Sequence, residues 1–278
     1  ATRFLEIAEA YANETDAAVW ADLATNLKGL EVLVRDEPYY TAFQAFAQRV
    51  FQAVGARVGW DARPDEGHLD ALLRSVVLGQ LGGYEDRDTL EEAKARFAAY
   101  VDDPANVHPD IRRAVFNLAA ATGDRSTYDS MWDLERRASL HEEKVRLLAA
   151  LGQFERPDLL SETLQMSLSE EVRVQDTIRV VVSVAGNRHG RDLAWEWSKA
   201  NWAELDRRYG EGGFGISTLV SLTWGFTTPE MREDVERFFR DHPVPAAERS
   251  ISQALERISV NTAWLARNRS DLAAWFVG

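Results

Sequence analysis

Apolar residues along this chain recur every three or four positions, the spacing that places side chains on one face of an α-helix. Two series show this spacing best: Val19, Leu23, Leu27 and Leu30, and then Leu69, Leu72, Leu73, Val76 and Val77. Strict alternation of apolar and polar residues, the pattern of a half-buried strand, is scarce. The pattern therefore predicts a chain that is helical almost throughout.

The strongest candidate for a strand is the segment from Ile178 to Val184, which is rich in β-branched residues. Polar residues 175–177 precede it and Gly186 follows it, and these are also the residues that begin and end a helix. We interpret the segment as a buried helix. The fold class is then all-α, with about fourteen helices of roughly 10 to 20 residues joined by short loops.

Other local signals predict where single helices begin and end. Asp88 with Glu91, and Ser139 with Glu142, have the spacing of a capping box, in which a side chain and an acid three residues later satisfy free amides. Glycines after apolar runs predict helix ends. These glycines include Gly55, Gly82, Gly152 and Gly210.

No Ser/Gly-rich or Pro-rich linker divides the sequence. We therefore expect one domain over residues 1–278, built as an array of antiparallel helix pairs. The longest irregular piece, residues 55–67, predicts a bend between two helical halves. The chain begins with Ala1 rather than Met, so we expect it to be a segment of something longer.

Charge and composition exclude several classes of function. Acidic residues outnumber basic ones by 45 to 32, which gives a net charge of -13, and such a chain repels nucleic acid and anionic membrane surfaces. Cysteine is absent, which excludes thiolate nucleophiles and favours a reducing compartment. The sequence shows neither a membrane span nor a secretory signal. We expect a cytoplasmic protein that binds no nucleic acid and no membrane.

Two motifs resemble cofactor sites without their required context. His141 and Glu142 begin like the zinc helix His-Glu-x-x-His, but the second histidine position holds Val145. The segment Gly210–Gly215 fits the letters of GxGxxG, yet residues 195–209 before it have helical rather than strand spacing. Because neither motif has its context, we expect no metal, no cofactor and no catalytic residue in this chain.

Charged residues gather in the segment Ser169–Thr177, between two apolar helical patterns. Paired carboxylates there would serve acid–base chemistry only in a cleft that raises one pKa, and helix caps and ion pairs are the more common result. The residues alone thus predict an acidic, all-helical, cytosolic binding or scaffolding domain.

The segment Val58–Arg74, Val-Gly-Trp-Asp-Ala-Arg-Pro-Asp-Glu-Gly-His-Leu-Asp-Ala-Leu-Leu-Arg, resembles the C-terminal helical domain of gluzincin zinc aminopeptidases. The likeness is closest to the puromycin-sensitive and membrane alanyl types and to endoplasmic-reticulum aminopeptidases. It continues in family order through Val19–Leu23, Ser169–Thr177, His189–Arg191, Asn201–Trp202, Gly212–Phe214, Phe238–Phe239, Ala247–Arg249 and Asn261–Leu265. The resemblance therefore covers nearly the whole chain.

This resemblance implies a HEAT-like α-solenoid, the superhelical domain of a zinc aminopeptidase whose catalytic domain is absent here. In that family the superhelix forms a bowl over the catalytic cleft, limits access to it and helps to hold peptide substrates. Zinc and its ligands belong to the catalytic domain, so this chain alone is not expected to be an enzyme. The implied partners are the catalytic domain of the same polypeptide and oligopeptide substrates.

The resemblance also suggests which residues face a peptide. The loops Ser169–Thr177 and Gly212–Phe214 match the family and are placed on the concave side, with Arg173, Gln175, Asp176 and Phe214 as candidate peptide contacts. Arg173 and Asp176 would equally form an internal ion pair. The alternative function is a freestanding α-solenoid that binds a protein or peptide without any catalytic domain.

Overall fold

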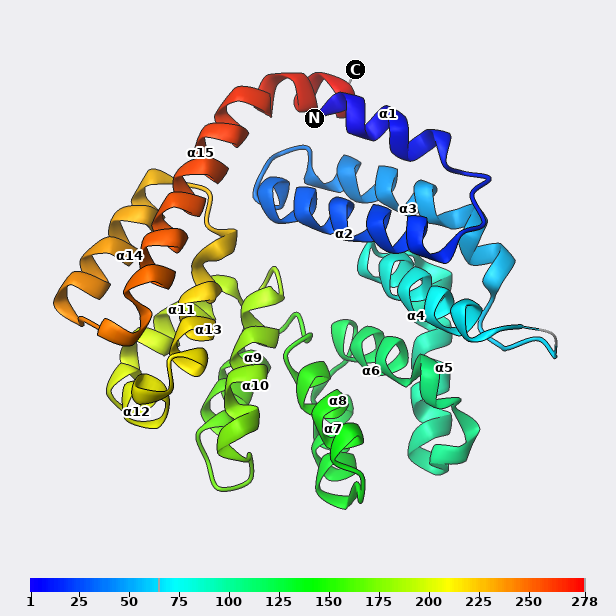
Figure 1. Cartoon of the computed structure of the whole chain (residues 1–278). Coiled ribbons are helices and arrows are strands. Elements are labelled where there is room, and N and C mark those ends of the chain that lie inside the picture. The colour runs from blue at the N-terminus through cyan, green and yellow to red at the C-terminus, as the bar shows by residue number, and fades with distance from the viewer. Residues whose placement is uncertain (65, 278) are drawn as a thin grey trace. The chain divides into compact units, whose positions relative to one another are not determined.

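The computed structural model describes residues 1–64 and 66–277, and every regular element within them is a helix (Figure 1). The α-helices are α1 (Thr2–Ala10), α2 (Ala17–Val34), α3 (Tyr40–Val58), α4 (His68–Gly83), α5 (Arg87–Asp102), α6 (Arg112–Ala121), α7 (Arg125–Arg137), α8 (His141–Leu151), α9 (Pro157–Ser167), α10 (Val174–Gly186), α11 (Arg191–Ala200), α12 (Trp202–Tyr209), α13 (Phe214–Val220), α14 (Pro229–Asp241) and α15 (Glu248–Val277). The all-α prediction is confirmed, and the segment Ile178–Val184 lies inside α10.

The chain divides into two compact units. Unit 1 comprises residues 1–122 and 268–278, and unit 2 comprises residues 123–267. The expected bend at 55–67 falls within unit 1, where α3 continues to Val58 and a loop then leads to α4; position 65 lies outside the described residues. The prediction of one superhelical domain with a bend at that loop stays a prediction.

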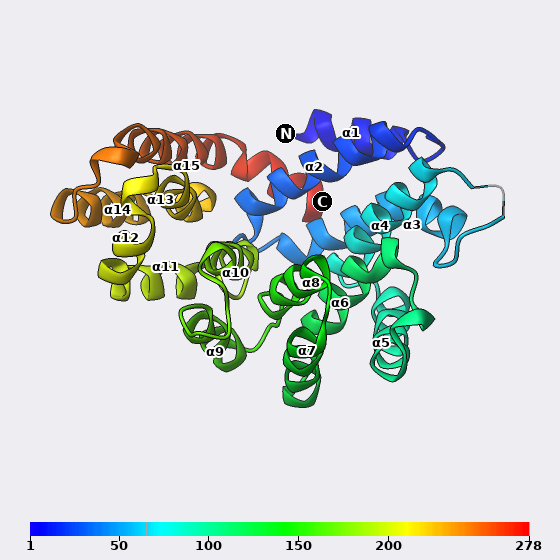
Figure 2. The ribbon, with the colours of Figure 1, turned by 60° about the horizontal axis from the view of Figure 1, so that its bottom comes forward.

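In unit 1, α4 packs against α2, α3 and α6, while α5 pairs with α6 (Figures 1 and 2). Aromatic rings close its core. Phe43 makes edge contacts with Tyr84 and with Phe276 near the end of α15, at centroid distances of 5.9 and 6.0 Å. The N-terminus also contacts α15 here, because the Ala1 amine donates to the Asn268 side-chain oxygen over 3.4 Å.

The loop that leads into α4 is held by one buried cation. Arg74 is 2% exposed, donates hydrogen bonds to the Val58 and Gly59 carbonyls, and pairs with the Glu66 carboxylate. Carbonyls at the end of α3 have no helical partner of their own, so the guanidinium satisfies them and fixes the path of the chain. Arg74 therefore links the end of α3 and Glu66 to α4, within the segment that has the clearest family likeness.

Unit 2 repeats the antiparallel helix pair: α7 packs on α8, α9 on α10, and α10 on α8 and α11, as both views show. An aromatic cluster fills the space between α11, α12 and α14. It consists of Trp195, Trp202, Phe226, Phe238 and Phe239, each less than a tenth exposed. Edge-to-face contacts of this kind stabilise a core beyond its buried area.

Several expected helix ends need correction. Gly55 lies inside α3 and Gly82 lies inside α4. Close packing accounts for the glycine at position 82, since a Cβ there would lie 2.5 Å from the Leu118 side chain. Gly152 and Gly210 do follow their helices as expected. The two predicted capping boxes are wrong, since Asp86 rather than Asp88 caps α5. The helix α8 begins after Leu140 and has no side-chain cap.

Candidate functional site

The candidate site lies in unit 2, at the loop between α9 and α10. Contacts with buried residues fix the backbone of this loop. Thr177 is fully buried and its hydroxyl donates to the Ser167 carbonyl over 2.6 Å. Val172 inserts from the loop and is 3% exposed. Arg208 reaches from α12 and donates to the Leu168 carbonyl over 3.0 Å. The loop therefore presents its outer side chains from a fixed backbone.

The surrounding charges are arranged to keep Arg208 in this position. Hydrogen bonds from Arg207, and then from Arg208, hold the pKa of Glu204 at about 2. The Glu204 carboxylate is ionised at neutral pH and accepts a hydrogen bond from the Arg208 guanidinium, which also donates to the Leu168 carbonyl. Glu204 and Arg208 are both on α12, one turn apart.

Three of the sequence-predicted residues stand at the start of α10. Arg173 occupies the N-cap position and, like Gln175, is exposed, whereas Asp176 in the first turn is only 3% exposed. Two of the three side chains can therefore reach a ligand on the outside. Asp176 faces inward, toward α8.

His141, the first residue of α8, lies between Arg173 and Asp176. Arg173 Nη1 is 3.4 Å from His141 Nδ1, and His141 Nε2 is 3.7 Å from Asp176 Oδ1. A guanidinium can only donate, so His141 Nδ1 is the acceptor in its contact with Arg173. Within the described chain Arg173 and Asp176 make no direct ion pair with each other, because the imidazole separates them.

Phe214 begins α13 and is 85% exposed, the largest exposed fraction among the large apolar side chains of the described residues. Gly213 before it has φ +64°, a conformation that glycine adopts without strain, and this turn directs the chain into α13. A ring exposed to this degree contributes nothing to the core. The ring is therefore accessible from outside the chain.

The structure brings the two predicted loops together. The Tyr209 hydroxyl, at the end of α12, donates to the Val174 carbonyl at the start of α10 over 2.5 Å. Helices α10 and α13 also pack closely, since a Cβ on Gly215 would lie 3.0 Å from the Ile178 side chain. The starts of α10 and α13, which are about 40 residues apart, therefore form one surface, here called the α10–α13 surface.

Sequence reasoning missed three members of this surface. In the sequence, His141 resembles half of a zinc motif, Tyr209 ends a helical pattern, and Val174, which is 53% exposed, belongs to no motif. An apolar residue directly after Arg173, at the N-terminus of a helix, was the available signal for Val174. Nothing in the sequence links Tyr209 to it.

The arrangement offers contacts rather than catalytic groups. One exposed cation, one amide and two exposed apolar side chains are suited to holding an extended peptide by charge, hydrogen bonds and apolar contact. Within the described residues, no three His, Asp or Glu side chains converge to hold a metal ion.

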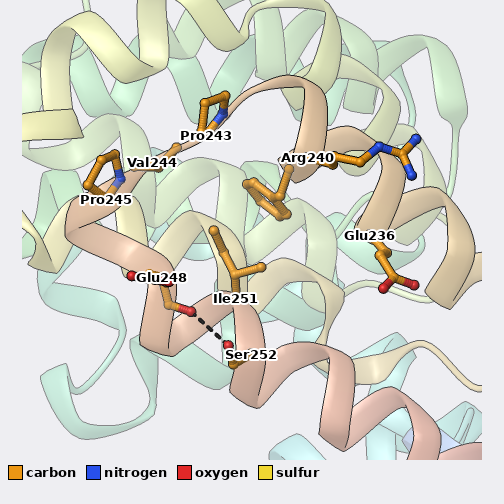
Figure 3. A pocket seen from close by; sticks show the side chains of 9 residues that line it. Glu236, Arg240, Pro243, Val244, Pro245, Glu248, Ile251 and Ser252 are labelled. Atoms are coloured by element: carbon orange, nitrogen blue, oxygen red, sulfur yellow. Dashed lines mark hydrogen bonds between the residues drawn. The ribbon is translucent and has the colours of Figure 1, made fainter.

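A separate groove lies where α14 meets α15, and no sequence-predicted residue lines it (Figure 3). Its volume is about 370 Å³ and its floor is apolar, formed by Phe239, Val244 and Ile251. Figure 3 shows Glu236 and Arg240 at one side of the groove and Glu248 at the other. Glu236 is already paired with Arg232 over 2.8 Å, so this rim is partly neutralised from within the chain.

Across residues 1–64 and 66–277, no helix has both the length and the apolar character that crossing a bilayer would require.

Comparison with known proteins places this geometry in a family context. The chain is 31% identical over 268 residues to Aminopeptidase M1 of Arabidopsis thaliana, covering 94% of this chain and 30% of that protein. It is 32% identical over 275 residues to Aminopeptidase M1-A of Oryza sativa subsp. japonica, covering 96% and 31%. Aminopeptidase A of Gloydius brevicauda is 28% identical over 279 residues, covering 99% and 28%.

The chain thus spans about three tenths of the length of the curated relatives it matches. The family described as "ERAP1-like C-terminal domain" matches residues 1–260, nearly the entire helical array. This match covers both loops of the α10–α13 surface and the α4 segment that Arg74 holds. On this evidence the chain belongs to the ERAP1-like C-terminal domain family.

Proposed function

We propose that this chain is the non-catalytic C-terminal domain of a zinc aminopeptidase, which covers the catalytic cleft, limits access to it and helps to hold peptide substrates. The catalytic domain, with its zinc, is the portion of the relatives that this chain does not span. The immediate partners are then that domain of the same polypeptide and the peptides it hydrolyses. The chain itself performs no chemical step in this proposal.

The observation that carries the peptide-holding role is the α10–α13 surface. Phe214 is 85% exposed and Arg173 is exposed as well. The two residues stand at the starts of α13 and α10, and the Tyr209–Val174 hydrogen bond links the end of α12 to the start of α10. An exposed aromatic ring gains most from an apolar side chain laid against it, and Arg173 offers a charge-assisted hydrogen bond to a peptide carbonyl or carboxylate. Gln175 adds a neutral donor and acceptor.

Asp176 has a different part in the proposal. Because it is buried and faces His141, it positions the imidazole that Arg173 approaches and does not itself touch the peptide. Its role is thereby narrowed from a candidate contact to a support for Arg173. The freestanding scaffold remains the alternative, and it shares the same surface.

The test uses the full-length protein and two substrates, an aminoacyl amide and a peptide of about ten residues. Phe214→Ala is expected to raise KM for the long peptide by about three- to tenfold, since about 1.4 kcal/mol of lost contact corresponds to tenfold. The short amide cannot reach the surface, so its kcat and KM stay unchanged. Steady-state hydrolysis of both substrates measures the difference.

Val260→Ala is the matched control, because Val260 is also an exposed apolar residue of unit 2 and lies on α15. It should leave both substrates unaffected. Equal kinetics of Phe214→Ala and wild type on the long peptide would remove Phe214 from the proposal. A full-length protein with no aminopeptidase activity on either substrate would favour the freestanding scaffold.

A further inference from the structure

One face of α4 in unit 1 is apolar and uncovered. Leu69 is 66% exposed and Leu72 is 51% exposed, although their spacing places them on one apolar face with Leu73 and Val77. Leu73 and Val77 are buried, at 4% and 0%. The apolar face of α4 is therefore broader than the part that packs into the core, and Leu69 and Leu72 are exposed.

Small and apolar residues continue this face as a stripe, in which Val76 and Gly79 are half-buried and the other members are exposed. Leu69, Leu72, Val76, Gly79 and Gly83 follow one another at spacings of three or four, so they share an arc of about 80° along the helix. A Cβ built on Gly79 or on Gly83 meets nothing within 4 Å. The second half of this α4 stripe is thus open space beside bare backbone, which a partner can approach closely.

The α4 stripe also lacks charge. Between Ala71 and Tyr84 the sequence holds one charged residue, Arg74, and that side chain is buried on another face of the helix. Charged residues make up 28% of the whole chain, and a helix face in water normally carries its share of them. Exposed leucines on an uncharged face are typical of the core of a permanent interface.

We infer that the α4 stripe is the docking surface for the part of the polypeptide that lies outside this chain, an apolar face of the catalytic portion. The relatives extend to more than three times the length that this chain covers, so a large covalently joined partner is at hand. A tethered partner needs no charge steering to find the stripe, and the stripe carries none. This inference rests on the proposed full-length aminopeptidase.

The absence of cysteine from this chain makes the test direct. Leu69→Cys and Leu72→Cys are made in this chain and in the full-length protein, and the rate of thiol alkylation is followed by mass spectrometry of the α4 peptide. Both sites should react readily in the isolated chain and about tenfold or more slowly in the full-length protein, because an interface core excludes water and reagent. Asp88→Cys is the control, because Asp88 is an exposed residue of α5, and it should react at the same rate in the isolated chain and in the full-length protein.

Each other outcome overturns the inference. Equal reactivity of Leu72→Cys in both proteins would show that the catalytic portion does not cover the stripe. Protection in the isolated chain that grows with concentration, together with a dimer in light scattering, would assign the stripe to a second copy. Protection in an isolated monomer would mean that the chain covers the stripe itself. None of these readings depends on peptide kinetics, so the test fails or succeeds independently of the α10–α13 surface.

Discussion

The α10–α13 surface and the α4 stripe are both exposed, yet they are built in opposite ways. The first combines an aromatic ring with a guanidinium, an amide and an imidazole, all on short helix starts and loops. The second is a run of leucine, valine and glycine on one straight helix, without an exposed charge. Mixed chemistry is suited to partners that come and go, whereas an uncharged apolar face in water is stable only when it is covered.

The two faces of α4 provide the strongest test of this comparison. Gly82→Ala places a methyl group against Leu118 in a packed contact and is expected to destabilise the chain by about 1–3 kcal/mol. Gly79→Ala, on the open stripe of the same helix, should stabilise the isolated chain by about 0.5–1 kcal/mol through helix propensity alone. Urea unfolding of both variants measures the contrast. Equal losses would show that the stripe is packed.

Removing the support below the α10–α13 surface should have the next largest effect. Thr177→Val keeps the side-chain shape but leaves the buried Ser167 carbonyl without its donor, at a cost of about 1–2 kcal/mol. Thr218→Val removes a hydroxyl hydrogen bond to the Phe214 carbonyl that is exposed to solvent, so a loss of only about 0.5 kcal/mol or less is expected. Thermal unfolding of the two variants side by side would contradict the fixed-loop description if they lost the same stability.

Acid should destabilise unit 2 by protonating the Asp234 carboxylate, a kind of group that is absent from the α4 stripe. Burial alone would raise the pKa of Asp234, but hydrogen bonds from Lys199 and Trp195 outweigh it and hold that pKa below its usual value. The stabilisation is therefore complete above the unfolded value of 3.8 and is lost as pH falls through the lower folded pKa. Asp234→Asn should be about 1 kcal/mol less stable than wild type at pH 7, and this difference should shrink as pH falls below 3.8.

The measurement is urea unfolding of wild type and Asp234→Asn at several pH values from 7 to about 3. Other carboxylates titrate in both proteins, so only the difference between them is read. A gap that stayed constant down to the lowest pH would mean that the carboxylate charge contributes nothing.

The smallest effect concerns the link between the two loops. Tyr209→Phe removes one exposed hydrogen bond to the Val174 carbonyl, so the unfolding free energy should fall by only about 0.5 kcal/mol. Hydrogen exchange of the segments around Val174 and Phe214 should nevertheless become faster in both together, because each braces the other. Faster exchange in one segment alone would show that the loops are independent.

Periodicity was enough to predict the helices and the all-α class, because helical spacing of apolar residues depends on local geometry alone. The assignment of Ile178–Val184 to a helix rested on its flanking residues and is confirmed. Local signals were weaker at helix ends: Gly82 looked like a terminator, yet it is a packing glycine against Leu118. Close approach of two helices has the same sequence signature as a helix end, and only the packing separates them.

The candidate site was predictable in part. Sequence and resemblance selected Arg173, Gln175, Asp176 and Phe214, and their role as peptide contacts stays a prediction. Sequence alone does not distinguish the exposed Arg173 and Gln175 from the buried Asp176, because the direction of each side chain depends on how α10 packs against α8. The imidazole of His141 between them comes from a helix more than 30 residues away.

By itself, the sequence determined the class of fold, the family and the absence of any thiol chemistry, since these follow from spacing, likeness and composition. The tertiary structure alone decided which apolar residues form the core and which are left outside. Leu72 and Leu73 are neighbours with the same side chain, yet one is half exposed and the other is buried. The reason is that adjacent residues on a helix point in directions about 100° apart, so two neighbouring leucines face different surroundings. The sequence shows that both are apolar, and only the packing of neighbouring helices decides which of them is buried.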